Sequence, residues 1–283
     1  MEKHNVSLFI KFLIYVVMIT FTVMTIYPIF WLIVQSFKST QVFTTTSKLS
    51  IPAFPRDWYF GNYPFVWTQV GFYNFFNNSV IYSVITVVTV VLLANMAGFA
   101  FAKIPFKITK FFHGLFIVGI LLTIQSILIP IFLMINAVNL FNTRLGVLIP
   151  YVGLGLPIGV YLFTDFIRNG IPGELIESAR IDGASFLRAF GSIVFPMCAP
   201  VSITLAIITF ISTWNEFILM SLLTSGDMYK SIPAAVGRFA GNLGTDYGKL
   251  FTALSISIIP ILIFYFIFRK QITKGVAAGA VKG

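Results

Sequence analysis

The chain has 283 residues, of which 58% are hydrophobic, 17% aromatic and only 10% charged. Soluble domains carry about 25% charged residues, so this composition excludes an ordinary soluble protein and indicates a membrane protein. The net charge of +10 comes from Lys and Arg residues scattered between apolar segments, which is typical of loops beside a bilayer and not of a nucleic-acid-binding surface.

Six apolar segments are long enough to cross a membrane. A spanning helix needs about twenty mostly apolar residues, and lipid offers the backbone no hydrogen-bond partners. These segments are too long for barrel strands, so the sequence predicts an all-α polytopic membrane protein with six transmembrane helices in a single domain, 1–283. The expected spans are about 12–35, 79–102, 111–135, 145–167, 199–224 and 250–268.

The basic residues predict that both termini lie in the cytoplasm. Of the 19 Lys and Arg residues, twelve fall in one set of loops and seven in the other, and the more basic side of a membrane protein is the cytoplasmic one. The loop of about 36–78 is therefore expected outside. Its aromatic residues suit a small cap at the headgroup level. They are Phe54, Trp58, Tyr59, Phe60, Trp67 and Phe72.

The longest cytoplasmic link, 169–198, has the pattern of two short helices joined by a turn. Pro172 is suited to a helix start, where its missing N–H would be unpaired anyway. Asp182 and Gly183 form a strong turn signal. After the turn, apolar residues recur with helical spacing, and Pro196 is expected to end this second helix. The recurring residues are Phe186, Ala189, Phe190, Ile193 and Val194.

The physical pattern of this link leaves two interpretations open. Glu174 and Glu177 lie in the opening turns of the first helix, where negative charge complements the helix dipole. The second helix can lie against the bundle while the first projects its charged side chains outward. The element is then either a docking surface for another protein or an interfacial helical hairpin without a partner.

The same residues resemble a known family signature. Membrane subunits of ABC importers carry Glu-Ala-Ala, three residues, Gly, nine residues, and then Ile-x-Leu-Pro. This chain keeps every spacing and departs from the pattern at two positions, Ser178 and Phe195, which preserve size or hydrophobicity. The matching residues are Glu177, Ala179, Gly183, Ile193 and Pro196.

The resemblance extends beyond this element. The tail from Gly275 to Gly283 is similar to the ending of maltose-type permeases of the carbohydrate uptake family. Tyr27-Pro28 resembles the end of that family's first span, and the segment from Trp214 to Phe217 resembles its Trp-Asn-Asp/Glu-Phe stretch. This combination implies a permease subunit of a sugar importer in the bacterial or archaeal cytoplasmic membrane. A polyol, glycerol-phosphate or peptide is the alternative cargo.

The resemblance also implies a mechanism and a set of partners. The first helix of the link is expected to be a coupling helix seated in a cytoplasmic ATPase, with Glu177 facing a basic ATPase residue. The expected partners are a second related permease, two ATPase subunits that bind ATP and magnesium, an extracytoplasmic solute-binding protein and the lipid bilayer. The coupling residues implied are Glu174, Glu177, Ala179, Asp182, Gly183, Ala184, Ile193 and Pro196.

Two further segments acquire roles by the same resemblance. Within the cytoplasmic tail, 270–283, the end of the chain is expected along the ATPase interface, against the alternative of a mobile basic tail. The relevant residues are Gly279, Val281, Lys282 and Gly283. An outer loop is expected to reach into the binding protein, against the alternative of a simple connector. Its residues are Gly241, Asn242, Leu243, Gly244 and Thr245.

Polar residues inside the expected spans are candidates for the translocation path. Glu216, with Asn215 beside it, is the most costly to place in hydrocarbon, although its position late in the fifth span also suits a solvated interfacial role. Asn95 and Gln125 are uncharged and equally suit hydrogen bonds between helices.

Other classes of protein fit the sequence less well. Cys198 is the single cysteine and the two histidines are far apart, so no disulfide and no metal site is expected. Gly244 to Lys249 fails as a phosphate loop, because the spacing is short and Leu250 replaces the Ser or Thr that would hold magnesium. We therefore expect that the chain binds no cofactor and is a transport subunit without enzymatic activity. A secondary transporter or channel would favour ionisable groups or a polar ring at mid-membrane, and neither is evident.

Overall fold

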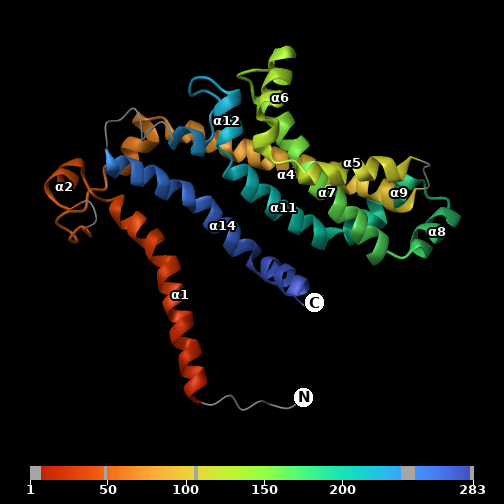
Figure 1. Cartoon of the computed structure of the whole chain (residues 1–283), viewed down its shortest axis with the longest axis horizontal. Coiled ribbons are helices and arrows are strands. Elements are labelled where there is room, and N and C mark those ends of the chain that lie inside the picture. The colour runs from red at the N-terminus through yellow and green to blue at the C-terminus, as the bar shows by residue number, and fades with distance from the viewer. Residues whose placement is uncertain (1–7, 48–49, 105–107, 237–245, 281–283) are drawn as a thin grey trace. The chain divides into compact units, whose positions relative to one another are not determined.

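The structure, a computed structural model, describes residues 8–47, 50–104, 108–236 and 246–280, and within these ranges its regular elements are all helices (Figure 1). The predicted all-α class is confirmed. The elements, with η for a π-helix, are α1 (Leu8–Gln35), α2 (Thr40–Thr45), α3 (Asn62–Pro64), η1 (Phe65–Gln69), α4 (Phe72–Lys103), α5 (Thr109–Leu121), α6 (Ile124–Ala137), α7 (Arg144–Gly170), α8 (Gly173–Ile181), α9 (Phe186–Ala189), η2 (Phe190–Val194), α10 (Phe195–Met197), α11 (Ala199–Trp214), α12 (Ile218–Leu223) and α14 (Tyr247–Ala280).

Four helices in the described part of the chain are long and apolar enough to cross a membrane: α1, α4, α7 and the part of α14 up to Gln271. Two bent pairs bring the total to six if each pair is counted as one span. One pair is α5 with α6, and the other joins the helical segment Phe186–Met197 to α11. The fold is therefore polytopic, with four to six candidate spans.

The expected span of 111–135 is not one straight helix. It consists of α5 and α6, with a bend of 110° between them. The backbone is extended at Leu122 and Thr123, and the hydroxyl of Thr123 lies 2.8 Å from that of Ser126. This extended backbone ends the first helix, and a new helix begins at Ile124, although the hydropathy of the segment is uninterrupted.

The chain divides into two compact units, which are described separately. The first comprises the described residues of Met1–Tyr73 and Val236–Ile259, and the second those of Asn74–Ala235 and Pro260–Gly283. The first unit holds α1, the cap (defined here as residues 36–71) and the beginning of α14. The second unit holds α4 from Asn74 onward, the elements from α5 to α12 and the remainder of α14.

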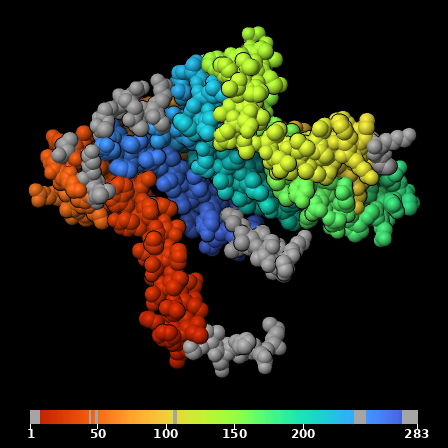
Figure 2. All heavy atoms as spheres, in the orientation of Figure 1, coloured from red at the N-terminus to blue at the C-terminus, as the bar shows by residue number. Residues whose placement is uncertain are grey.

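In the first unit, α1 carries exposed apolar side chains along most of its length. The atoms of this helix are the red spheres in Figure 2. A helix that is hydrophobic on all sides needs lipid or other helices around it. At its end, Trp31 packs edge-on against Phe251 of α14, with ring centroids 5.3 Å apart. Phe43 of α2 stacks on the same Phe251 ring at 5.9 Å. Aromatic contacts therefore join the end of α1, the cap and the start of α14.

The cap is held together by backbone-directed hydrogen bonds. The side-chain amide of Asn62 donates to the carbonyls of Ser36 and Lys38, at 2.9 and 2.8 Å. The hydroxyl of Thr252 in α14 donates to the Ser36 carbonyl at 3.0 Å. Lys38 and Trp58 form an antiparallel bridge. Buried polar groups thus find partners inside the cap, as a stable loop of this length requires.

The second unit has a core between α4, α7 and α11. Its central residues include Val90, Ala94, Val160, Phe163 and Leu205. Gly159 of α7 faces Ala94 and Leu205 so closely that a Cβ there would clash with both. Small residues allow helix backbones to approach in membranes, where packing and not water exclusion drives association. The close approach of α7 therefore depends on this glycine.

Candidate functional site

The predicted link of 169–198 folds as helix, turn and helix in the second unit. The first helix, α8, begins directly after Pro172, as expected from its sequence. Ile171 and Ile176 are buried and anchor the helix to the core. Lys103, at the end of α4, donates from its Nζ to the Ile171 carbonyl at 2.6 Å. The anchor fixes where α8 starts and leaves its other face free.

The turn after α8 is a Schellman motif. Gly183 has a φ of +83° and donates its N–H to the Arg180 carbonyl at 3.0 Å. Ala184 donates its N–H to the Ala179 carbonyl at 2.9 Å. Glycine is the residue that adopts this left-handed conformation without a Cβ penalty, and the two bonds satisfy carbonyls at the helix end. Gly183 therefore has a definite geometric reason to stand in the signature.

The second helix of the link differs in detail from the prediction. It begins at Phe186 after the Ser185 hydroxyl accepts from the Arg188 N–H at 3.3 Å, and then widens into η2 before α10. The prediction that Pro196 ends the helix is wrong, since Pro196 lies inside α10. The wide turn of η2 places Pro196 in the first turn of a new segment, where a missing N–H is tolerated.

The inward face of this second helix follows the apolar spacing of the sequence. Ala189 and Val194 are buried, and Phe186 and Phe190 pack against the core cluster. Phe190 contacts Phe99 of α4 with ring centroids 5.5 Å apart, and Ile193 is half-buried. The second helix is thus docked on the bundle through its contacts with α4 and the core cluster.

The outward face of the link is both charged and apolar. Glu174, Glu177, Asp182 and Gly183 are exposed, while Ala179 and Ala184 are half-buried. Exposed apolar side chains lie among these charged residues. Ile181 is 85% exposed and Leu187 is 72% exposed. An exposed surface of this mixed kind is typical of a protein-binding site.

A second candidate region is a cavity of about 610 Å³ where two helices are interrupted. Leu122 lies at the bend between α5 and α6, and Asn215, Glu216 and Phe217 lie between α11 and α12. The expected span of 199–224 is therefore two helices and not one. The apolar walls of the cavity come mainly from α7 and α11. The polar groups that line it are Tyr151, Thr209, Ser212, Thr213, Asn215 and Glu216.

Glu216 lies between α11 and α12 and caps the start of α12. Its carboxylate oxygens accept the N–H groups of Leu219 and Met220, at 2.7 and 2.9 Å, in the first turn of α12. The hydroxyl of Tyr151 on α7 donates to the same carboxylate at 2.8 Å. A negative group at a helix N-terminus satisfies unpaired N–H groups and complements the dipole. Glu216 thus links α7 to the start of α12.

The other predicted path residues are distributed unevenly. Asn215 lines the cavity and donates to the Ile211 carbonyl at 2.8 Å. Gln125 is exposed near the start of α6, and Asn95 is fully buried in α4, but neither lines the cavity. Among the described residues, no partner is found for either polar side-chain atom of Asn95. The structure therefore brings Asn215 and Glu216 together and leaves the other two elsewhere.

Sequence reasoning missed Tyr151 and Thr209. Tyr151 was hidden because an aromatic residue in an apolar span gives no sign that its hydroxyl faces a carboxylate. Thr209 lines the cavity with a buried hydroxyl that has no partner among the described residues. A signal for it existed, since Thr209, Ser212 and Thr213 recur at helical spacing just before Glu216.

Some predicted residues lie outside the described part of the chain. The loop residues Gly241, Asn242, Leu243, Gly244 and Thr245 belong to this group, as do the tail residues Val281, Lys282 and Gly283. Gly279 lies within α14. The expected roles of these two segments therefore stay predictions.

Comparisons with known proteins bear on both regions. Residues 91–277 match the family described as "Binding-protein-dependent transport system inner membrane component". A putative ABC transporter permease protein, ORF2, of Caldicellulosiruptor sp. strain Rt8B.4 is 34% identical over 256 residues, which cover 90% of this chain and 91% of the relative. The diacetylchitobiose uptake system permease protein NgcG of Streptomyces coelicolor is 30% identical over 268 residues, with 94% and 87% covered.

A solved structure is similar in fold. It is a chain of a bacterial ABC transporter involved in the import of the acidic polysaccharide alginate, with a TM-score of 0.78. The match covers 93% of this chain and 96% of the other, at 22% sequence identity. The matched family segment contains the whole link of 169–198 and the cavity between the interrupted helices.

Proposed function

Since this chain belongs to the family of binding-protein-dependent transport system inner membrane components, we propose that ATP-driven conformational change enters it through the outward face of α8. The chain is the permease subunit of a binding-protein-dependent ABC sugar importer. It is a multi-pass inner-membrane protein that works with ATPase and binding-protein partners, and it is a transport subunit and not an enzyme.

The observation that carries the proposal is that the two helices of the link have different surroundings, one being packed in the core and the other exposed. One helix, α9 with η2, is packed into the core through Ala189 and Val194. The other, α8, exposes Glu177 and Ile181 beyond the bundle and is fixed at both ends. An element that is rigidly mounted and outwardly exposed is suited to receive a partner and to pass on its displacement as a rigid body.

In this proposal Glu177 faces a basic residue of a cytoplasmic ATPase. The exposed apolar side chains of the link fill the ATPase groove that surrounds this basic residue. Two ATPase subunits bind ATP and magnesium, and their closure favours one of two states of the membrane subunits through differential contacts. A second related permease completes the path, and both termini of this chain lie in the cytoplasm. The predominance of basic residues on one set of loops supports that orientation.

The cavity beside Glu216 is proposed as this subunit's part of the translocation path. Interrupted helices expose backbone groups, and such backbone is tolerated at membrane depth only where it is buried in protein or lines a cavity. Two interruptions meet at this one cavity. The hydroxyls of Thr209 and Ser212 and the amide of Asn215 supply donors and acceptors that suit a cargo rich in hydroxyl groups.

The decisive experiment reverses the charge of Glu177 in the complete transporter reconstituted in vesicles. We expect Glu177→Lys to abolish sugar uptake while the subunit still inserts, because the new cation faces a basic partner residue. Asp165→Lys is the matched control, since Asp165 is also exposed but lies on α7 and not on α8. Uptake is measured with radiolabelled sugar, together with ATP hydrolysis. Undiminished uptake by Glu177→Lys would contradict the coupling role.

A further inference from the structure

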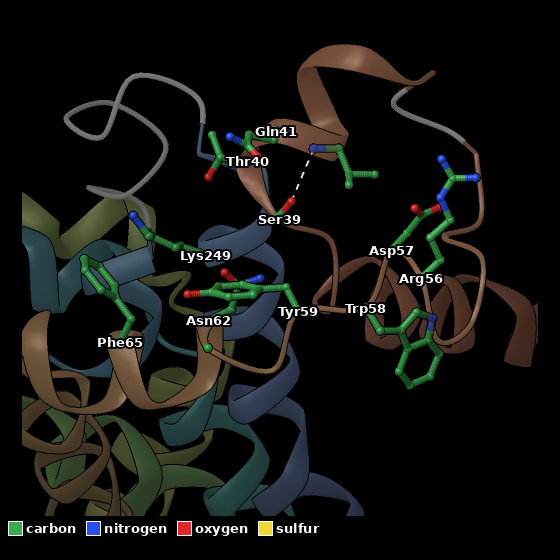
Figure 3. Close-up of a pocket in the computed structure, with 12 residues that line it drawn as sticks. Ser39, Thr40, Gln41, Arg56, Asp57, Trp58, Tyr59, Asn62, Phe65 and Lys249 are labelled. Atoms are coloured by element: carbon green, nitrogen blue, oxygen red, sulfur yellow. Dashed lines mark hydrogen bonds between the residues drawn. The ribbon is translucent and has the colours of Figure 1, made fainter.

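The cap contains a cavity of about 630 Å³ that is separate from the region around Glu216 (Figure 3). Its wall is formed by the segments 39–42, 56–59 and 61–62, with Phe65 of η1 and Lys249 of α14. Tyr59 and Asn62 lie in the middle of the view, between Lys249 on one side and Trp58 on the other (Figure 3). The volume falls within the range of about 300–1,000 Å³ that is usual for small-molecule sites.

Tyr59 presents an aromatic surface in this cavity. Its ring lies over Gly61, where a Cβ would collide with the outer ring atoms. Its backbone N–H is fixed by the Phe37 carbonyl at 2.7 Å, yet its side chain is 53% exposed. The outer end of the ring therefore packs against Gly61, and the exposed part of the ring is available to a ligand.

The polar groups around Tyr59 are held in place by the cap itself. Both amide hydrogens of Asn62 are used on the carbonyls of Ser36 and Lys38, which fixes the orientation of this side chain. Asp57 accepts the N–H of Ala53 through one carboxylate oxygen at 3.1 Å and keeps further acceptor capacity. The cavity is thus lined by pre-positioned hydrogen-bonding groups beside an aromatic surface.

The charges around the cavity are balanced. The ammonium group of Lys249 lies 2.8 Å from the carboxylate of Asp246 and 4.0 Å from the Phe65 ring centroid. Arg56 and Asp57 are adjacent and of opposite sign. No single charge dominates the cavity, so it suits a neutral polar ligand better than an ion.

We propose that this cavity binds a pyranose ring of a saccharide. Such a ring has an apolar C–H face, which fits the exposed face of Tyr59, and an edge of hydroxyl groups, which fits Asn62, Asp57 and Ser39. The choice of a saccharide rests on the proposed function of the chain as part of a sugar importer. The cavity is then a second saccharide site, formed by the cap and Lys249 of α14.

The test measures saccharide binding to the complete transporter in lipid nanodiscs without its binding protein. The probe is maltotriose, which has three pyranose rings, and saturation-transfer NMR gives its apparent Kd. Sorbitol, which has hydroxyl groups and no ring face, is titrated in parallel. We expect Tyr59→Ala to weaken maltotriose binding about tenfold through loss of the aromatic surface.

Gly61→Ala provides a second variant that keeps the tyrosine. The added Cβ meets only the flexible outer end of the Tyr59 side chain, so the ring shifts without disruption of the cap. It should weaken binding in the same direction as Tyr59→Ala. Tyr73→Ala is the control, because Tyr73 is exposed in the same unit but does not line the cavity.

The outcomes separate this inference from the function of the chain. Unchanged maltotriose affinity in both cavity variants would overturn the saccharide site, as would sorbitol binding of equal strength. Loss of binding-protein association in Tyr59→Ala with intact maltotriose affinity would overturn it too and assign the cavity to that protein. The transport function is judged independently by uptake in the Glu177→Lys variant.

Discussion

Glu216 illustrates how one residue can satisfy several buried donors. The sequence presented it either as a path residue or as a solvated carboxylate near an interface. The structure adds that its oxygens accept two backbone N–H groups of α12 and the hydroxyl of Tyr151. A carboxylate in apolar surroundings needs such partners, because burial without them is costly.

These contacts predict a loss of stability when the carboxylate is removed. Glu216→Ala should lower the free energy of unfolding by about 1–2 kcal/mol, the usual effect of removing a helix cap. Glu216→Gln retains one carbonyl acceptor and should lower it less. The measurement is denaturation of the detergent-purified chain, with Asn215→Ala as the neighbouring control. An equal effect of the two alanine variants would contradict the capping role.

Lys38 is a buried cation in the cap. Its side chain is 0% exposed, and its Nζ donates to the Ser47 carbonyl and the Ser50 hydroxyl, both at 3.1 Å. Burial lowers the pKa of Lys38 from its ordinary value of 10.5, while the Asp57 carboxylate opposes that shift. The folded cap therefore binds the Lys38 proton less tightly than the unfolded chain does.

This difference predicts a dependence of stability on pH. Between the lowered pKa of Lys38 and 10.5 the unfolded chain holds more protons, so the free energy of unfolding should rise as the pH rises through that window. Lys38→Met should remove that rise, whatever its effect at neutral pH. Melting temperatures across the alkaline range test this, with Lys11→Met as an exposed control. Equal slopes of melting temperature against pH in the unaltered chain, Lys38→Met and Lys11→Met would refute this role of Lys38.

At the scale of elements, the turn between α8 and α9 depends on one backbone conformation. Gly183 and Gly191 both have open space around the position of a Cβ, but only Gly183 has a positive φ. A comparison of the two positions therefore distinguishes the effect of backbone conformation from the effect of steric space around a side chain. The pair allows the turn to be tested with the same substitution at both sites.

Gly183→Ala should weaken the link, because a left-handed conformation costs an L-residue about 1–2 kcal/mol. Gly191→Ala should have little effect or a slightly stabilising one, since alanine favours helices. The measurements are unfolding of the purified chain and the ratio of sugar imported to ATP hydrolysed by the transporter. A lower ratio in the Gly183 variant alone is expected. Similar values for the two variants would argue against a special role for the turn.

The helical interruptions show what hydropathy does not reveal. The segments 111–135 and 199–224 are apolar throughout and give the expected signal of a single span. At Glu216 the carboxylate accepts backbone N–H groups of the next helix, and at Thr123 the backbone is extended and the hydroxyl pairs with that of Ser126. Such side chains are common in spans, so their sequence does not indicate which of them interrupts a helix.

At the scale of the whole molecule, we predict that ATP acts from outside this chain. The segment from Gly244 to Lys249 lacks the spacing and the hydroxyl residue of a phosphate-binding loop. We predict that the chain purified alone does not bind a fluorescent ATP analogue at concentrations that saturate the complete transporter. The complete transporter serves as the positive control. Binding to the isolated subunit would show that the ATPase partners are not the sole nucleotide sites.

The sequence alone determined the membrane class, the all-α fold and the place of the two-helix link. These follow from composition, hydropathy, turn residues and the signature spacing, which are local properties of the chain. It also marked Glu177 and Gly183, and the structure supplied the Schellman turn as the reason for the glycine. Local rules were sufficient for these features, whose residues are neighbours both in sequence and in space, but they did not locate the breaks at Thr123 and Glu216.

Only the tertiary structure decided how distant segments combine. Tyr151 faces Glu216, Lys103 holds Ile171, and the cap gathers Tyr59 and Lys249 around one cavity. Each pair joins residues far apart in the chain, and no periodicity relates them. Their positions depend on how helices pack and where they are interrupted, which is fixed by close contacts such as that at Gly159. The partners of a polar side chain in a bundle are therefore known only once the bundle has formed.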